Sequence, residues 1–509
     1  MSTRLTDFSI VSQVDSLPEN TLVIVGAALD GPSNIPFKLA DGLDPYDYLG
    51  QSPLADAYYA AQQMSMNNII AYRLNGVHAT AMLVDRDGKQ ILELESVSAS
   101  DNYNLLRAVV YPDHLYVVGT DEVARSYFFN RYKTARELAY AINRDAFYGL
   151  LEFNARIIDE YYILEDMVDI ETDLMFQGGL TEAEYINHRD PLGEQVTIDA
   201  QVVPMLKERL KTALFGIDPD AQRERDPGGE LGVLPFGVIT VCDLFHDDDV
   251  EVTEMLGSFC KNKTEGMGVG CMGVVGTKPI FPTVVDEGDE VDFDEDVQMR
   301  ILELTSLTDF MADEESLSYV QVIVGQTEYV ESDTSSISLA YAYAAAQAQY
   351  SYNTIMSNKR LEGVGNLKFD LSKEDVALLT ANGYICIVPS IRRGFVPYYS
   401  TSYSKNQDSV LSKPHHIRIS QYVSRILTEE LDMMVGENYT TLSIKDAISA
   451  AETLLNDLVV EGIFREYSLE YSLSNNNTEM SLEVSLTPFS EIRAIASVAT
   501  VSFPQGVIV

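Results

Sequence analysis

The stretch 319–350, YVQVIVGQTEYVESDTSSISLAYAYAAAQAQY, decides the fold class of this chain. Its first part, Tyr319–Val324, is a short apolar run rich in β-branched residues, which predicts a strand buried on both faces. Its last part, residues 335–350, is rich in alanine and predicts a long helix. The same alternation of predicted strands and helices recurs along the chain, with strands at 231–241 and 382–389, an apolar run at 269–275, and helices at 201–214 and 252–262. Buried strands that alternate with helices indicate an α/β sheet covered on both faces.

Two segments with different sequence patterns precede this α/β module. Residues 21–25, a helix at 53–66 and a strand at 68–73 form a strand–helix–strand unit, in which Pro53 suits the first helical turn. Residues 78–178 are rich in alternating strands, with Asp87-Gly88 as a predicted hairpin turn. A single helix at 134–143 has Thr134 and Glu137 at the spacing of a capping box. This segment is expected to form a β-rich domain, a sandwich or a barrel.

The C-terminal part reads as helices followed by a hairpin. An amphipathic helix is predicted at 416–435, and Ser443 is expected to cap a second helix that Gly462 ends. Strands at 463–473 and 479–487 form a predicted hairpin around Ser474–Asn477. At the two ends of the sequence, residues 3–16 and 495–503 alternate like strands. A terminal strand cannot satisfy its own backbone groups, so each must pair with a sheet edge in its own subunit or in a neighbour.

These sequence patterns divide the chain into six expected parts: an arm at 1–20, the strand–helix–strand part at 21–77, the β-rich domain at 78–178, the α/β module at 179–400, a C-terminal α+β domain at 401–493 and an arm at 494–509. The α/β module resembles subtilisin in the order of its elements. The expected fold class is therefore multidomain, α/β and α+β: a subtilisin-like module with a β-rich insertion and a C-terminal α+β domain, flanked by extended terminal arms.

The composition excludes several classes of function. The chain has 509 residues, with 35 Lys plus Arg against 78 Asp plus Glu, and a net charge of −43. Binding of nucleic acid or of an anionic membrane needs a basic surface, so both are disfavoured. No apolar run is long enough to span a membrane, and the first 16 residues have no apolar core of a signal peptide. We therefore expect a soluble intracellular product with no membrane insertion.

Cysteine usage and short motifs indicate no cofactor. The four cysteines, Cys242, Cys260, Cys271 and Cys386, form no CxxC pair, so buried free thiols in a reducing compartment are expected. No Walker A loop, GxGxxG, HExxH or GxSxG occurs in the sequence. We predict no catalytic residue, no metal and no cofactor.

Two acidic segments and one serine cluster need separate consideration. The cluster Phe245–Asp249 could bind a divalent cation through carboxylates, although a solvated acidic loop explains it as well. The run 286–296 holds eight acids and is expected to be an exposed loop without helix. Ser335 and Ser336 stand where a subtilase carries its nucleophile, which keeps an α/β hydrolase as a remote alternative. A serine nucleophile needs a histidine base, and no histidine lies between His246 and His415, so these serines are expected to cap a helix.

Several stretches together resemble the bacteriophage contractile tail sheath family. They are LVIVGAALDGPSN (22–34), YDYLGQSPLADA (46–57), NNIIAYRLNG (67–76), YKTARELAYAIN (132–143), the segment 357–394 from SNKRLEGVG to SIRRG, and LTPFSEIRAIASVATV (486–501). Each motif is weak alone, but their order and spacing are more specific, and they extend over nearly the whole chain. The segments 150–178 and 286–296 depart from the family pattern.

The resemblance implies a structural subunit rather than an enzyme. Copies would form helically stacked hexameric rings around an inner tail tube, attached to baseplate and tail terminator proteins. Contraction on baseplate triggering would drive the tube through the host envelope. The protein would be part of the virion tail, assembled in the host cytoplasm. The sheath of a tailocin, an extracellular injection particle or a type VI secretion system is the nearest alternative; type VI sheaths divide the body between two proteins.

The resemblance also implies which residues meet neighbours. In the family, terminal arms add strands to a neighbour's sheet, and this would assign the arm contacts to Phe8, Ile10, Val11, Ile495, Val498, Val501 and Phe503. The C-terminal region of the family faces the tube, so Lys445, Asp446, Glu452 and Asp457 would meet it. An ordinary solvated helix face explains these four charges as well.

Overall fold

The computed structural model has two compact units, residues 1–425 and residues 426–509. The residues that it describes are 8–10, 20–120, 123–148, 150–164, 167, 171–182, 203–216, 229–247, 249–267, 269–278, 293–309, 315–328, 336–367, 371–404, 412–432, 441–473 and 480–489. No described helix combines the length and the apolar character needed to cross a membrane.

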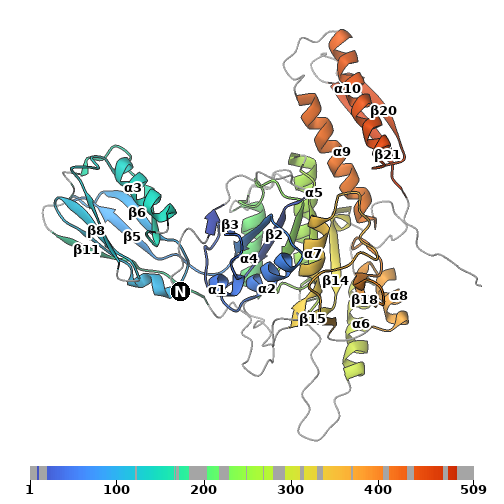
Figure 1. Cartoon of the computed structure of the whole chain (residues 1–509), viewed down its shortest axis with the longest axis horizontal. Helices are drawn as coiled ribbons and strands as arrows, with labels where there is room; N and C mark the ends of the chain where they lie inside the picture. The colour runs from blue at the N-terminus through green and yellow to red at the C-terminus, as the bar shows by residue number, and fades with distance from the viewer. Residues whose placement is uncertain are drawn as a thin grey trace, which may run out of the picture. The chain divides into compact units, whose positions relative to one another are not determined.

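A nine-stranded sheet forms the centre of the first unit (Figure 1). Its order is β1 (Phe8–Ile10), β3 (Pro36–Leu39), β4 (Ile69–Arg73), β2 (Leu22–Gly26), β12 (Val238–Val241), β13 (Met272–Gly276), β14 (Val320–Val324), β18 (Tyr384–Ser390) and β19 (Gly394–Pro397). The strands from β4 to β18 in this order pair in parallel. At the edges, β1 pairs antiparallel with β3, β3 with β4, and β19 with β18. Because β2 pairs with both β4 and β12, the early strand–helix–strand part and the later α/β module share one sheet.

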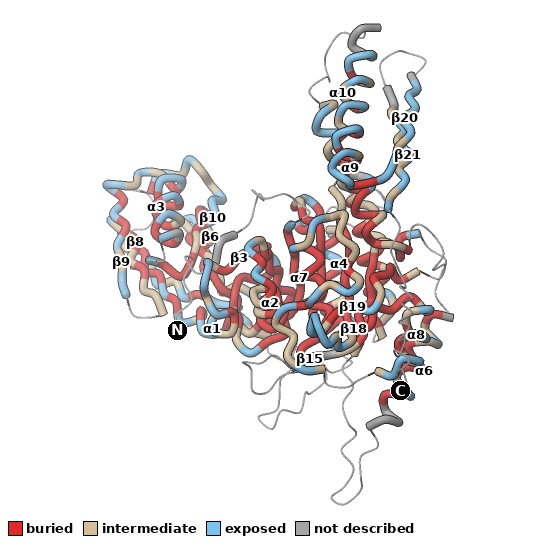
Figure 2. Tube along the Cα trace, turned by 45° about the vertical axis from the view of Figure 1, so that its right-hand side comes forward, coloured by how far each residue is buried: buried red, intermediate tan, exposed pale blue. Residues whose placement is uncertain are grey.

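Helices cover both faces of this sheet, as the buried strands predicted. Along β2, Leu22 and Ile24 face α2 (Pro53–Gln63) and α7 (Leu339–Gln349), whereas Val23 and Val25 face α4 (Val203–Phe215) and α5 (Val250–Met267). A third apolar cluster packs α6 (Phe293–Asp309) and α8 (Lys373–Ala381) against β14 and β18. Figure 2 shows the resulting buried core at the strands. All four cysteines are buried free thiols, as expected.

A β-rich domain is inserted between β4 and α4. One sheet has the order β10 (Phe153–Ile157), β6 (Gln90–Ser96), β5 (Thr80–Val84); the other has the order β11 (Thr172–Met175), β7 (Arg107–Val110), β8 (His114–Val118), β9 (Ala124–Phe128). Both sheets share one core with α3 (Ala135–Phe147), whose N-cap is Thr134. Gly88 has a φ of 80° in the β5–β6 turn, which supports the predicted hairpin.

Smaller elements complete the first unit, and the second unit is helical with a hairpin. The small elements are α1 (Pro45–Leu49), β15 (Gln326–Glu328), β16 (Ser336–Ser338), β17 (Asn366–Leu367) and two 3₁₀ turns at Asp101–Leu105 and Glu315–Tyr319. Helix α9 (Pro414–Asp432) begins in the first unit and ends in the second. The second unit then contains α10 (Thr441–Val460), β20 (Glu466–Leu473) and β21 (Met480–Thr487).

Four sequence predictions on element bounds were wrong. The strand expected at 231–241 is confined to Val238–Val241. The helix expected from residue 335 begins at Leu339, because Ser338 is its N-cap and Ser336 belongs to the strand β16. Helix α10 begins at Thr441, so Ser443 lies inside its first turn. The end of the acidic run 286–296 is helical, because α6 begins at Phe293.

Candidate functional site

The C-terminal hairpin presents two open strand edges. Strands β20 and β21 pair over eight residues each, from Glu466↔Thr487 to Leu473↔Met480. Among the described residues, no third strand joins this sheet. An isolated two-stranded ribbon is marginally stable in water, and its outer N–H and C=O groups are a template for further strands. Both outer edges of this hairpin are therefore unpaired within the part of the chain that the structure describes.

The two faces of the hairpin differ strongly. The apolar pairs Tyr467↔Leu486, Leu469↔Val484 and Tyr471↔Leu482 lie on one face, where α10 contacts β20 through the Tyr467 hydroxyl, which donates to the Glu452 carbonyl at 3.4 Å. Five of these six apolar residues are half-buried, and the sixth, Tyr471, is exposed at 55%. The other face consists of serine and glutamate residues with one threonine, Thr487, and Glu470 lies directly opposite Glu483. The apolar face is thus incompletely covered in the single chain.

Helix α10 exposes the four charged residues that the resemblance assigned to the tube. Ala447, Ala451, Leu455 and Leu458 form its buried face, at the spacing of one helical stripe. Lys445, Asp446, Glu452 and Asp457 are all exposed on the opposite side. The arrangement makes these charges available to a partner. Their contact with a tube remains a prediction.

The predicted arm residues are only partly described. Phe8 and Ile10 lie in β1, which pairs antiparallel with β3 of the same chain in the register Phe8↔Leu39 and Ile10↔Phe37. The N-terminal segment therefore uses its own subunit's sheet edge in this structure. Val11, Ile495, Val498, Val501 and Phe503 lie outside the described residues, and their pairing stays a prediction.

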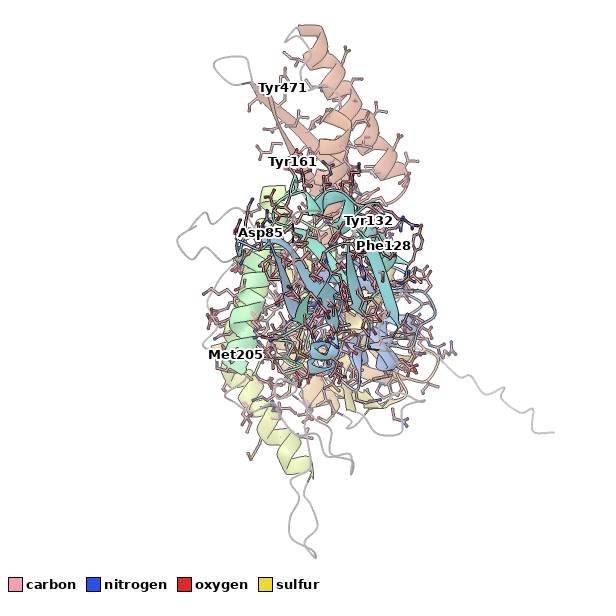
Figure 3. All side chains as sticks on the ribbon, turned by 90° about the vertical axis from the view of Figure 1, so that its left-hand side faces the viewer. Asp85, Phe128, Tyr132, Tyr161, Met205 and Tyr471 are labelled. Carbon is pink, nitrogen blue, oxygen red and sulfur yellow. The ribbon has the colours of Figure 1, made fainter. Side chains whose placement is uncertain are left out.

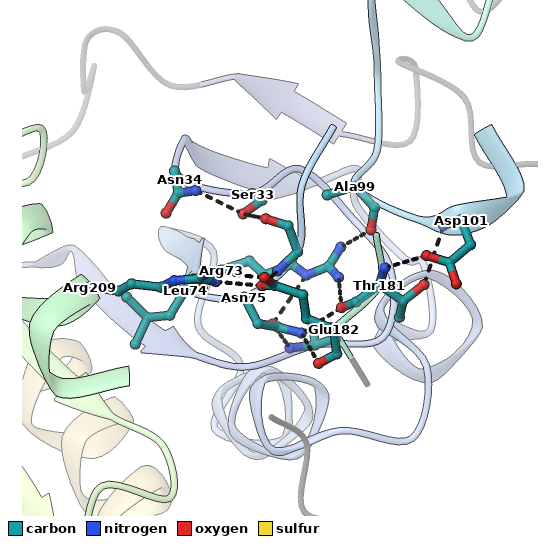
Figure 4. Close-up of polar contacts among 12 residues, drawn as sticks. Ser33, Asn34, Arg73, Leu74, Asn75, Ala99, Asp101, Thr181, Glu182 and Arg209 are labelled. Atoms are coloured by element: carbon teal, nitrogen blue, oxygen red, sulfur yellow. Dashed lines mark hydrogen bonds and ion pairs between the residues drawn. The ribbon is translucent and has the colours of Figure 1, made fainter. Parts of the chain in front are cut away.

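A buried arginine joins the β-rich domain to the central sheet (Figure 4). Arg73 ends β4 and is fully buried; its guanidinium donates to the carbonyls of Gly31 at 2.7 Å, Ala99 at 2.8 Å and Thr181 at 3.1 Å. Its Nε donates to Asn75 Oδ1 at 3.2 Å. Burial lowers the pKa of Arg73 to about 10, while Asp30 and Glu182 favour its charged form. We call these residues the Arg73 joint.

The segment that returns from the β-rich domain closes this joint. Glu182 accepts from the Gly76 N–H at 2.7 Å and pairs with Arg209 of α4. Burial alone raises the pKa of Glu182, but the bonds from Arg209 and Gly76 bring the pKa below its usual value. Asn75 donates to the carbonyls of Ala28 at 2.9 Å and Thr181 at 3.0 Å. The segment that leaves the central sheet for the β-rich domain and the segment that returns from it are therefore held together at this joint.

The joint was not predicted from the sequence, in which Arg73 is the end of a predicted strand within one of the sheath-like motifs. The available signal was a charged residue that directly follows the apolar run Ile69–Tyr72 and precedes Asn75-Gly76. A charged group in such a strand must find polar partners when it is buried. Its partners lie up to 108 positions away in the sequence, and no local pattern indicates them.

In the acidic cluster at 245–249, Asp247 and Asp249 pair with the chain's own cations, whereas Asp248 lies outside the described residues. Arg300 pairs with Asp247, which also accepts from the Lys278 N–H at 2.7 Å. Burial raises the pKa of Asp247 despite this pairing. Lys207 binds Asp249 at 2.6 Å. Among the described residues, no group of three or more His, Cys, Asp or Glu side chains could hold a metal ion.

The histidine that precedes the serine cluster in the sequence, His246, contacts a threonine and two tyrosines. His246 is buried between Tyr384 and Tyr403 and contacts the Thr253 hydroxyl at 2.8 Å. Burial lowers its pKa to about 3. Ser338, rather than Ser336, caps α7, and its hydroxyl accepts from the Ala340 N–H at 3.3 Å. Ser335 lies outside the described residues.

Comparison with solved structures identifies the fold. A sheath tail protein from Listeria innocua matches 94% of this chain and 93% of its own length, with a TM-score of 0.54 and 15% identity. A sheath tail protein from Desulfitobacterium hafniense matches 94% of this chain and 100% of its own length, with a TM-score of 0.48 and 10% identity. No family model and no curated protein matches the chain. The chain thus shares the fold of the Listeria protein, a mixed α/β multidomain fold with several sheets.

Proposed function

We propose that the chain is a subunit of a contractile tail sheath and belongs to that family. It polymerises as helically stacked hexameric rings around an inner tube, and contraction on baseplate triggering drives the tube through the host envelope. The subunit is structural rather than enzymatic and takes no cofactor. The fold shared with a sheath tail protein supports this proposal. We also retain the subtilisin-like description of the α/β module as part of it.

The open-edged hairpin is the observation that carries the proposal. A two-stranded ribbon with a half-covered apolar face gains backbone hydrogen bonds and buried area when strands from other subunits are added. Head-to-tail contacts of this kind do not close on themselves and generate helical filaments. Bonds between main chains do not depend on side-chain fit, so they persist while the subunit bodies repack. A contracting lattice needs such a linkage.

The proposal assigns partners to particular surfaces. The arm residues Ile495, Val498, Val501 and Phe503, together with Phe8, Ile10 and Val11, pair with a neighbour's sheet. For Phe8 and Ile10, this requires β1 to leave the edge of β3 that it occupies in the single chain. The exposed charges of α10 meet the tube, and baseplate and tail terminator proteins close the two ends. Nucleic acid and membrane lipid are not partners.

The high negative charge also fits this assembly. Copies with a net charge of −43 repel one another, which delays polymerisation until a template of complementary charge is present. We place the sheath in the tail of a phage particle assembled in the host cytoplasm. Neighbouring capsid and terminase genes would agree with this placement. A neighbouring disassembly ATPase gene would instead point to a type VI system.

Removal of either arm tests the proposal. We expect that deletion of residues 1–16, or of residues 495–509, leaves a folded protein that no longer polymerises, because the hairpin edges lose their strands. Circular dichroism checks the fold and sedimentation measures the polymer. A matched control replaces the same residues with a flexible Gly-Ser segment of equal length, which preserves length but not strand formation. Normal polymer from either truncation would contradict the assignment of that arm.

A further inference from the structure

The outer face of α3 in the β-rich domain is not an ordinary solvated surface. Arg136, Tyr140, Arg144 and Tyr148 follow one another at every fourth position, which aligns them on one side of the helix. Tyr140 is 60% and Tyr148 62% exposed. The opposite side is buried through Leu138, Ala139, Ile142 and Ala146. We call the four outward residues the α3 stripe.

The stripe continues onto a neighbouring loop. Thr134, the N-cap of α3, forms an isolated antiparallel β-bridge with Ile163, and Arg136 forms an ion pair with Glu160. Tyr161 is 78% exposed; Figure 3 views the molecule from the side of the β-rich domain and labels this residue. Large exposed aromatic side chains gathered with arginines are the composition of protein–protein hot spots.

The arginines of the stripe are held in place before any partner arrives. The Arg136 guanidinium lies 5.5 Å from the centre of the Tyr140 ring. Arg144 pairs with Asp145 at 3.1 Å, and the Tyr127 hydroxyl donates to the same carboxylate at 2.9 Å. A side chain that is already ordered loses less conformational entropy on binding. The stripe is therefore preorganised for contact.

Charge indicates the kind of partner. Two of the four stripe positions are arginines and none is acidic, in a chain that has 78 acidic and 35 basic side chains. Arg136 and Arg144 each pair with one carboxylate of their own chain, Glu160 and Asp145, and keep further guanidinium N–H donors for a partner. Arginine binds carboxylates through two parallel hydrogen bonds, and tyrosine hydroxyls donate to them as well. The acidic surface that meets this chain most often in a sheath is that of another copy. We propose that the α3 stripe docks onto an acidic surface of a second copy of this chain, an inference that rests on the proposed function.

Matched charge variants test this contact in the polymerising full-length protein. In Arg136→Glu/Arg144→Glu, repulsion replaces attraction at the contact, and we expect the protein concentration needed for polymerisation to rise about tenfold or more. Tyr140→Ser/Tyr148→Ser tests the same surface with no change of charge and is expected to act in the same direction. The control, Arg86→Glu/Arg392→Glu, makes an equal charge change on exposed loops outside the stripe and leaves polymerisation within about twofold of wild type. Circular dichroism verifies that each variant is folded.

Photo-cross-linking identifies the occupant directly. A benzoylphenylalanine at position 140 is irradiated in the polymer of purified protein, and mass spectrometry locates the cross-link. We expect a product of twice the chain mass, joined to an acidic stretch of the second copy. Wild-type polymer with unchanged stripe variants and no such product would overturn this inference while leaving the proposed function standing. A wild-type chain that never polymerises would contradict both.

Discussion

Replacement of Arg73 by methionine tests how the β-rich domain is held. Methionine has a similar length but no donor, so it removes the four hydrogen bonds that Arg73 donates. The loss is unequal: the carbonyl of Gly31 keeps a bond from the Ala99 N–H, and that of Thr181 keeps one from Asn75. For the carbonyl of Ala99, by contrast, the hydrogen bond found among the described residues is the one from Arg73, and the substitution removes it.

The magnitude follows from two opposing contributions. Four hydrogen bonds from a charged donor are worth about 6 kcal/mol at the low end of their usual range. Burial, partly offset by the charges of Asp30 and Glu182, lowers the pKa of Arg73 to about 10, which corresponds to a net electrostatic cost of roughly 3 kcal/mol for its charged form. We therefore expect Arg73→Met to lower the free energy of unfolding by about 3 kcal/mol. Arg73→Lys keeps the charge but cannot reach all four acceptors, so it should fall between methionine and wild type.

The assay has two readouts. Urea unfolding followed by circular dichroism gives the free energy, and limited proteolysis reports whether the β-rich domain is released by cuts near residues 76 and 181. The exposed Arg392→Met is the matched control and should stay within about 0.5 kcal/mol of wild type. If Arg73→Met is within about 1 kcal/mol of wild type and resists protease equally, the reasoning about this joint is refuted.

Two further predictions concern the polar groups near the ends of the parallel strands. Burial lowers the pKa of His246 to about 3, below its usual 6.5. The contribution of the neutral ring to the free energy of unfolding is therefore fully present above pH 6.5 and is lost as the pH falls towards 3. Between pH 7 and pH 5 wild type should therefore lose about 2 kcal/mol more than His246→Gln in urea unfolding, and equal losses would be inconsistent with a buried neutral ring. Because Arg300 and Lys207 occupy Asp247 and Asp249, EDTA should shift the melting temperature by less than about 1 °C; a rise of several degrees on addition of calcium or magnesium would contradict this.

Local patterns in the sequence predicted much of the fold. Apolar β-branched runs located β2, β4 and β14, and Asp87-Gly88 located the β5–β6 turn. The start of α7 was misplaced because residues 333–338 include several residues that can cap a helix, and tertiary pairing of Ser336–Ser338 with β15 decides among them. Likewise, nothing local indicates that β2 pairs with β12, which lies more than 200 residues later.

The candidate site was harder to predict, because its partners are distant in sequence. The acidic cluster at 245–249 is ambiguous until Arg300 and Lys207 are placed beside it. Arg73 gives no hint of Ala99 or Thr181. By contrast, the hairpin follows directly from alternation in residues 463–473 and 479–487, and its open edges follow from the topology.

The most direct test of the sheath assignment is electron microscopy of the purified chain. The chain is imaged in low and high salt, alone and with the tube protein encoded beside it. Screening of the net charge of −43 removes the main barrier between copies, so we predict long, striated, hollow tubes wide enough to hold a protein tube. Dispersed single chains under all four conditions would contradict the assignment.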